Sequence, residues 1–302
     1  MGSLHLGIDL GGTNVKWVVL HGDEGNVQAK GHVPTDTSRG ERSVVEQLVR
    51  IAHNCNADLG QIDSVGVGVP GLYHPAAGTT RFMPNVPGNW EGVPVANEVG
   101  EAVRAPASII NDARAFTLAE HRLGAGREAG SMLGITLGTG VGGGLILNGS
   151  LYLGYEGTAG EFGHQTILPE GPPCNCGNKG CLEALTRADR IVEACGQPTV
   201  ERSVQAARDG DQRAINAFHQ TGRYLGIGVS NTLVLLSVDR VVVGGGVAAA
   251  GDLLIEPIKQ ELKRRVFITD LERVQVVAAE LGIWAGAIGA ALYGAGAAPF
   301  VS

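Results

Sequence analysis

The strongest constraint in this sequence is a pattern that occurs twice, an apolar strand that runs into a glycine turn and then into a second strand. Leu4–Leu10 leads into Gly11-Gly12, and Met132–Leu137 leads into the glycine-rich stretch Gly138–Gly144. Short apolar runs bounded by glycine are typical of buried strands. Segments with helical spacing follow each pair. The sequence therefore predicts a duplicated α/β architecture, with two domains around a cleft.

The rest of the chain extends this pattern. After two antiparallel strands, further strands are predicted at Val27–Val33, Ser64–Val69, Ala107–Ile110, Arg240–Val243 and Val274–Val277, and helices at Ser43–Ala52, Val93–Val103, Ala113–Leu123, Ala214–Leu236 and Leu253–Lys263. We expect a smaller N-terminal domain at 1–112, completed by a C-terminal helix at 284–302, and a larger C-terminal domain at 113–283. Short hinges are expected near 110–115 and 280–284.

Composition narrows the function. The chain has 302 residues, a net charge of −7 and no basic block, which argues against a nucleic-acid partner. Glycine is abundant, with 47 residues clustered between apolar runs, which indicates tight turns against ligands.

Residues 281–302 carry no charge, but their large side chains are spaced and no basic anchor follows, so a packed helix is expected and not a membrane span. No signal peptide is evident, and the odd number of cysteines, five, fits a reducing compartment. These features predict a cytoplasmic protein.

Three glycine turns at strand ends point to a nucleotide. In Asp9–Asn14, backbone amides of the turn suit phosphate oxygens and the aspartate suits a hydrated Mg²⁺, although a plain hairpin turn has the same pattern. Gly138–Gly144 has five glycines in seven positions, yet no Gly-Lys-Ser/Thr follows, so it is not a Walker loop. The third turn, Gly244–Gly246, ends an apolar strand and suits a base or ribose.

Asn111-Asp112 stands between a predicted strand and a predicted helix. An Asn or Asp is favoured there as a helix N-cap. A carboxylate at this junction also suits a general base that accepts a proton from an attacking hydroxyl in phosphoryl transfer. Both interpretations hold together if Asn111 caps the helix or binds a sugar while Asp112 faces a ligand.

The most specific pattern is a cysteine knuckle. Its three thiols are Cys174, Cys176 and Cys181, and His164 lies ten residues upstream of the first. Three thiolates and one imidazole make a closed tetrahedral zinc site, which is structural because no position stays open. Cys55 and Cys195 lie in helical patterns and are expected to be core residues.

Together these segments resemble the ROK family of repressors, open reading frames and sugar kinases. The glycine turns, Asn111-Asp112, the Glu-x-Gly-His motif ending at His164 and the cysteine knuckle occur in family order over nearly the whole chain. The resemblance implies an actin-like ATPase (ribonuclease H-like) fold. The chain begins directly at the first glycine-turn strand, without the helix-turn-helix of the repressors, which favours a kinase.

The resemblance also implies roles for individual residues. Asp112 would be the catalytic base acting on the sugar 6-hydroxyl, and His164 would bind zinc through one nitrogen and face the sugar with the other. The sugar-binding residues would be Gly68, Asn85, Asn111, Asp112, Glu161, His164 and Glu183. The nucleotide-binding residues would be Asp9, Gly11, Gly12, Thr13, Asn14, Gly138, Thr139, Gly140, Gly245 and Gly246.

The segment Arg81–Trp90 resembles the glucokinase members most, which predicts phosphorylation of D-glucose to glucose 6-phosphate by ATP with Mg²⁺ and a structural zinc. Three alternatives stay open: a kinase for N-acetylglucosamine, mannose, fructose or allose, a non-catalytic sugar sensor, and polyphosphate as the donor. The cysteine knuckle favours ATP over polyphosphate. By resemblance the chain would form a homodimer or homotetramer.

Overall fold

The first three strands form an antiparallel meander, as predicted. In the computed structural model, which describes residues 2–22, 25–296 and 300–301, β1 (Leu4–Leu10) pairs with β2 (Asn14–His21), and β2 pairs with β3 (Asn26–Pro34). All seven residues of β1 are buried, and every second position carries a large apolar side chain of the hydrophobic core, namely Leu4, Leu6, Ile8 and Leu10. β3 alternates between exposed and half-buried residues, as expected of an edge strand.

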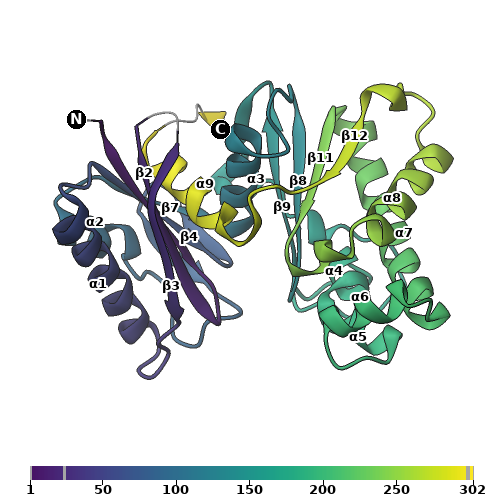
Figure 1. Ribbon diagram of the computed structural model, residues 1–302, viewed down its shortest axis with the longest axis horizontal. Helices are drawn as coiled ribbons and strands as arrows, with labels where there is room; N and C mark the ends of the chain where they lie inside the picture. Colours follow the sequence, from purple (N-terminus) through teal and green to yellow (C-terminus); the bar gives the residue numbers. More distant parts are fainter. Residues whose placement is uncertain (1, 23–24, 297–299, 302) are drawn as a thin grey trace. The chain divides into compact units, whose positions relative to one another are not determined.

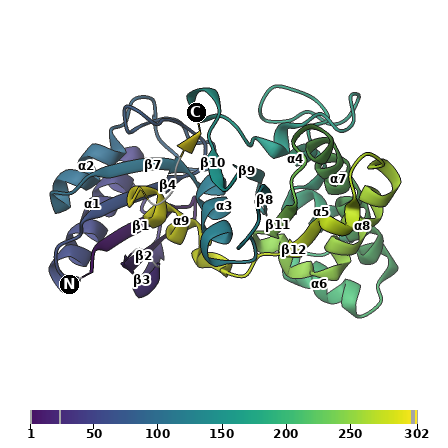
Figure 2. The same ribbon diagram turned by 90° about the horizontal axis from the view of Figure 1, so that it is seen from above.

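Two parallel strands complete this sheet, whose order is β3-β2-β1-β4-β7. The added strands are β4 (Ser64–Val69) and β7 (Ala107–Asn111). Helices α1 and α2 cover one face and α9 covers the other, with α3 packed behind α9 (Figures 1 and 2). Their bounds are α1 (Glu41–Leu59), α2 (Val95–Val103), α3 (Asp112–Leu123) and α9 (Ala285–Gly294).

Helix α9 approaches the sheet so closely that glycine is required at the contact. Gly66 and Gly7 are paired across β1 and β4, and a Cβ on Gly66 would lie 1.7 Å from the Ala290 carbonyl oxygen. On the opposite side of α9, a Cβ on Gly289 would lie 1.7 Å from the Ala115 carbonyl oxygen. Part of the glycine excess therefore serves helix packing and not turns against ligands, which corrects the interpretation made from composition.

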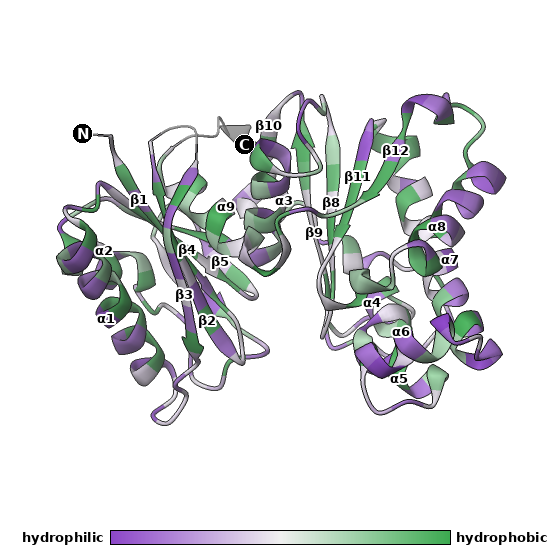
Figure 3. Cartoon of the chain, in the orientation of Figure 1, coloured by the Kyte–Doolittle hydropathy of each residue, from purple (hydrophilic) through white to green (hydrophobic). Residues whose placement is uncertain are grey.

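A second sheet repeats this plan. β8 (Met132–Leu137) and β9 (Val141–Leu147) form the antiparallel pair, and β11 (Arg240–Gly244) and β12 (Gln275–Ala278) are the parallel strands. The order β9-β8-β11-β12 matches β2-β1-β4-β7. The predicted duplication is thus confirmed. Helices α7 (Gln212–Leu236) and α8 (Asp252–Arg265) pack against each other. Figure 3 shows hydrophilic (purple) and hydrophobic (green) residues on α8, as expected of a helix with one buried face.

Several elements were not predicted from the sequence. A hairpin, β5 (Leu72–His74) with β6 (Thr79–Phe82), follows β4, and β10 (Ser150–Tyr152) pairs in parallel with β13 (Phe300–Val301). Three helices follow the cysteine knuckle: α4 (Leu182–Thr186), α5 (Ala188–Cys195) and α6 (Val200–Arg208). The 3-10 turns are η1 (Tyr155–Gly157), η2 (Phe162–His164), η3 (Gly246–Ala250), η4 (Leu271–Arg273) and η5 (Gly282–Trp284).

The chain divides into two compact units. The first contains Met1–Leu123, Ser150–Ala159 and Ile283–Ser302, and the second contains Gly124–Gly149 and Gly160–Gly282. The expected boundary at 112 falls at the start of α3, which the structure groups with the first unit because α3 packs on α9.

The C-terminal segment departs from the single helix expected at 284–302. Helix α9 ends at Gly294, and residues 300–301 form β13. The part of the prediction at 297–299 and 302 lies outside the described residues. Among the residues that the structure describes, no helix is long and apolar enough to cross a membrane.

Candidate functional site

In the first unit, three predicted site residues lie at one edge of the sheet. Asp9 on β1 is in register with Gly68 on β4, and Val69 on β4 is in register with Asn111 on β7. The carboxyl ends of these parallel strands therefore meet. Ligands of open α/β sheets bind outside this edge.

The turn after β1 is closed by its own backbone and by Thr35. The Gly11 amide donates to the Asn14 carbonyl at 3.0 Å, and the Thr35 hydroxyl donates to the Gly11 carbonyl at 2.7 Å. Gly12 lies against Asn85, because a Cβ on Gly12 would be 2.5 Å from the Asn85 carbonyl oxygen. The predicted phosphate turn is thus a hairpin turn as well, with Gly12 exposed and beside a predicted sugar-binding residue.

Lys16 belongs to this edge, although the sequence analysis left it out. Its ammonium lies 3.3 Å from the Asp9 carboxylate, and both side chains are largely buried. The pKa of Asp9 is raised above its usual value, because burial raises it by more than the nearby charge of Lys16 lowers it. The register of the hairpin was the missed signal: a turn closed by Leu10 and Val15 places Asp9 directly opposite Lys16.

Asn111 and Asp112 share the start of α3. The Asn111 carboxamide oxygen accepts from the amides of Ala113 and Arg114 at 3.1 and 3.3 Å, and its nitrogen donates to the Gly71 carbonyl at 3.3 Å. Asn111 is buried and acts as the helix N-cap. Asp112 is half-buried, and one of its oxygens accepts from the Ala113 amide at 2.8 Å. Capping by Asn111 holds the Asp112 backbone in place.

In the second unit, the four predicted zinc ligands converge. One ligand atom from each of His164, Cys174, Cys176 and Cys181 lies within 4.8 Å of all the others. The Cys176 and Cys181 sulfurs are 3.7 Å apart, and the His164 Nδ1 is 3.7 Å from the Cys174 sulfur. Tetrahedral zinc with bonds of about 2.3 Å to sulfur separates two sulfurs by about 3.8 Å. The spacing therefore fits a zinc ion. Burial raises the pKa of Cys181 to about 12, so binding of a metal there releases a proton.

Two predicted sugar-binding carboxylates flank this cluster. The Glu161 carboxylate lies 3.9 Å from His164 Nε2, the ring nitrogen that faces away from Cys174. On the other side, one Glu183 oxygen lies 3.9 Å from the Cys174 sulfur. The second Glu183 oxygen accepts from the Val141 amide at 3.0 Å. Each of two cluster residues, His164 and Cys174, thus has a carboxylate oxygen 3.9 Å away.

The glycine turn between β8 and β9 has one open position. The Gly138 amide donates to the Gly140 carbonyl at 2.9 Å, and a Cβ on Gly138 would meet no atom within 4 Å. Thr139 is exposed. Gly140 lies against Glu183, with 2.7 Å between its virtual Cβ and the carboxylate oxygen. The turn presents Gly138-Thr139 to solvent.

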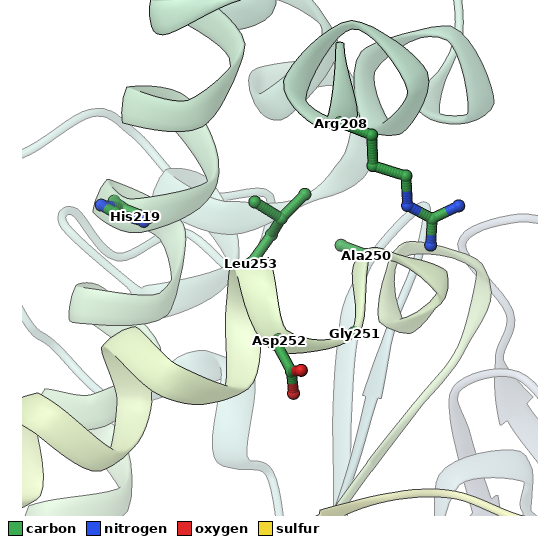
Figure 4. A pocket seen from close by; sticks show the side chains of 6 residues that line it. All are labelled: Arg208, His219, Ala250, Gly251, Asp252 and Leu253. Carbon is green, nitrogen blue, oxygen red and sulfur yellow. The ribbon is translucent and has the colours of Figure 1, made fainter. Parts of the chain in front are cut away.

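A hollow of about 510 Å³ lies a few residues beyond the third glycine turn along the chain. Gly245 and Gly246 are exposed at the end of β11, and η3 continues from them to Ala250. The hollow lies at the turn from η3 into α8. Figure 4 shows Arg208 near Ala250 and Asp252 at the start of α8; its lining residues are Arg208, His219, Ala250, Gly251, Asp252 and Leu253. Its size is within the range of small-molecule sites. Arg208, His219 and Asp252 were not singled out from the sequence, where single polar residues on helices carry no signal.

The predicted site residues therefore fall into two groups, one in each unit. The first unit holds Asp9, Gly11, Gly12, Thr13, Asn14, Gly68, Asn85, Asn111 and Asp112. The second unit holds Gly138, Thr139, Gly140, Glu161, His164, Cys174, Cys176, Cys181, Glu183, Gly245 and Gly246.

A duplicated α/β fold with a glycine turn in each half is the plan of the actin-like ATPases, and comparison with known proteins places the chain within that class. The model of the ROK family matches residues 5–295. The chain belongs to the ROK family. It is 33% identical over 312 residues to a glucokinase of Halalkalibacterium halodurans, covering 94% of this chain and 93% of that protein.

Solved structures agree with this assignment. The chain matches a ROK family glucokinase from Streptomyces griseus, crystallised with glucose and AMPPNP, with a TM-score of 0.84 and 29% identity over 97% of this chain and 100% of the other. A ROK hexokinase from Thermus thermophilus matches with a TM-score of 0.82 and 34% identity over 97% of this chain and 98% of the other.

Relatives named as a kinase of another sugar or as a repressor also match. An N-acetylgalactosamine kinase of Shewanella is 30% identical over 97% of each chain. A putative xylose repressor of Caldicellulosiruptor is 30% identical over 92% of this chain and 74% of the repressor. Family membership alone therefore does not select one sugar.

Proposed function

We propose that this protein is an ATP-dependent hexose kinase that phosphorylates D-glucose at its 6-hydroxyl. The observation that carries the proposal is the edge of the first sheet, where Asp112 follows β7, the neighbour of the Gly68 strand β4, which in turn is the neighbour of the Asp9 strand β1. A carboxylate and a phosphate turn at the same edge of a sheet are a pair of groups that phosphoryl transfer needs. The glucokinase names of the most similar relatives support glucose as the acceptor.

In this proposal Asp112 is the general base. Its carboxylate accepts the proton of the sugar hydroxyl as that oxygen attacks the γ-phosphorus in line, and ADP leaves. Asn111 holds Asp112 by capping α3. A hydroxyl oriented by a fixed carboxylate reacts faster because the cost of orientation has been met on binding.

Asp9 would hold Mg²⁺ through water molecules, and the metal neutralises phosphate charge when bound. The residues that would bind phosphate lie in the two turns, with Gly11, Gly12, Thr13 and Asn14 in one unit and Gly138, Thr139 and Gly140 in the other. Lys16 supplies a cation beside Asp9. Gly245 and Gly246, with the hollow at Arg208 and Asp252, are proposed to bind the adenosine end.

The cysteine knuckle is proposed to bind a structural zinc ion through His164, Cys174, Cys176 and Cys181. The charge and spacing of these four ligands support zinc, and a closed set of four leaves no position for a reactive water. A zinc bond at His164 Nδ1 would leave Nε2 protonated, as a donor toward a sugar hydroxyl beside Glu161.

Sugar selection is assigned to Gly68, Asn85, Asn111, Glu161, His164 and Glu183. Sites that pair each hydroxyl with a polar group reject epimers strongly, because a misplaced hydroxyl leaves a buried partner without a hydrogen bond. We therefore expect glucose to be preferred over mannose and N-acetylglucosamine. The homodimer or homotetramer and the cytoplasmic location stay predictions.

The test is ADP release by the purified protein over a panel of hexoses and amino sugars, with ATP and with polyphosphate as donors. The proposal predicts turnover with ATP and the highest kcat/KM on glucose. A higher kcat/KM on another sugar would assign the chain to that sugar within the same chemistry.

A second function, a sugar sensor without catalysis, is favoured by the similarity to a xylose repressor. Sugar binding measured by calorimetry, without ADP release on any sugar, would support the sensor and contradict the kinase. The carboxylate Asp112 counts against the sensor, because binding alone needs no base.

A further inference from the structure

The glycine turn between β8 and β9 is attached to the helix that follows the cysteine knuckle. All of the residues concerned belong to the second unit. Helix α4 is short, from Leu182 to Thr186, and begins immediately after the ligand Cys181. Glu183 in α4 and Ala188 just beyond it each form a hydrogen bond with the turn, at Val141 and at Gly138.

The first attachment is the Glu183 carboxylate. One oxygen accepts from the Val141 amide at 3.0 Å and lies 2.7 Å from the virtual Cβ of Gly140. The other oxygen lies 3.9 Å from the sulfur of the metal-cluster residue Cys174. The half-buried carboxylate thus lies between the cysteine cluster and the turn. A side chain at Gly140 would displace the carboxylate from this position.

The second attachment is the first residue of α5. The Ala188 amide donates to the Gly138 carbonyl at 2.8 Å. At Val141, the residue of the first attachment, the turn also lies against η2, since a Cβ on Gly163 would be 2.0 Å from the Val141 carbonyl oxygen. Gly163 directly precedes His164, so the segment that carries the cluster touches the turn at three points.

We propose that Glu183 and the Ala188 amide position the Gly138–Val141 turn, so that the turn and the cysteine cluster form one rigid body. Glu183 is then a positioning residue for phosphate binding in addition to its expected contact with sugar. The link to nucleotide rests on the proposed function, in which this turn binds phosphate. The link between Glu183 and the turn rests on the geometry alone.

Hydrogen exchange of the Val141 amide tests the geometric part. Replacement of the carboxylate by an apolar chain in Glu183→Met should speed exchange at Val141 by about 10- to 150-fold, the scale of one hydrogen bond to a charged group. Glu183→Gln keeps an acceptor oxygen and should restore most of the protection. Glu170→Gln, an exposed carboxylate of the same segment, is the matched control and should leave exchange unchanged.

Ala188→Pro tests the second attachment without touching a sugar-binding residue. Proline is favoured at the first position of a helix, and the preceding Arg187 already has the extended conformation that proline requires, with φ −62° and ψ 157°. The variant therefore removes the bond to Gly138 and keeps α5. Ala188→Ser keeps the amide and serves as the control.

The readout for function is Mg·ADP binding, measured by calorimetry without sugar. Both Glu183→Met and Ala188→Pro should weaken ADP about tenfold, whereas only Glu183→Met should also weaken glucose. Unchanged exchange at Val141 in Glu183→Met, together with ADP affinity within twofold of the parent in both variants, would overturn the proposal. Failure of the parent to bind ADP at all would instead refute the nucleotide function, while the exchange result would still decide the attachment.

Discussion

At the scale of single residues, the structure gives several side chains a structural task beside the predicted one. Asn111 was expected to cap a helix or to bind sugar, and its carboxamide caps α3 and bonds to Gly71. Gly12 was expected to approach phosphate, and it also leaves room for the Asn85 carbonyl. Lys16 shows the opposite case, because only the structure brings it beside Asp9 as a functional candidate.

Lys16→Met should raise the KM for Mg·ATP at least tenfold. The substitution leaves the buried Asp9 carboxylate without its cation and removes a positive charge from the phosphate turn. Steady-state kinetics at saturating glucose would measure the change. Lys30→Met is the matched control, because Lys30 is exposed on β3 and lies over the Trp284 ring; an equal effect of both substitutions would contradict a local role for Lys16.

At the scale of elements, the long strands and helices could be predicted from the sequence, whereas several short ones could not. Every predicted strand of the two sheets is present, because continuous apolar runs such as Ser64–Val69 record burial on both faces. The β5–β6 hairpin and helix α4 were missed because three to five residues show no periodicity. The cysteine cluster was found because ligand spacing is local, whereas the bond from Glu183 to Val141 joins residues 42 positions apart.

Removal of zinc should expose the knuckle without unfolding the chain. After chelation, Cys174, Cys176 and Cys181 are expected to react with iodoacetamide. The buried Cys55 and Cys195 should stay protected, because each is packed in a helix outside the knuckle and loses no metal contact on chelation. Mass spectrometry of peptides from the native and chelated protein measures both groups. Absence of zinc from the purified protein, or equal labelling of the three knuckle cysteines before and after chelation, would contradict the metal site.

At the scale of the whole molecule, the end of the chain completes the unit in which the chain begins. Helix α9 packs on β1 and β4, and α3 packs on α9 (Figure 2). A C-terminal helix that completes the first domain was predicted from the sequence, but α3 was predicted to belong to the other domain, because the packing partner of a helix is not recorded in its own sequence. Close helix packing through glycine was likewise invisible, since composition does not say which glycines lie in turns.

Gly289→Ala should destabilise the protein by about 3 kcal/mol, because the added methyl group meets the Ala115 backbone, which no rotamer change can relieve. Urea unfolding followed by circular dichroism measures the loss. Gly246→Ala, whose Cβ would meet no atom within 4 Å, is the control for stability. Equal midpoints for the two variants would refute the packing argument.

The central claim is that Asp112 activates a sugar hydroxyl for attack on ATP, and glucose-dependent ADP release by Asp112→Asn tests it most directly. The asparagine keeps the size of the side chain and an oxygen that can accept from the Ala113 amide, so the fold and glucose binding should be retained. We expect kcat to fall by about 10²–10⁴, the usual contribution of a general base. Activity within tenfold of the parent, in a variant that still binds glucose, would contradict the claim.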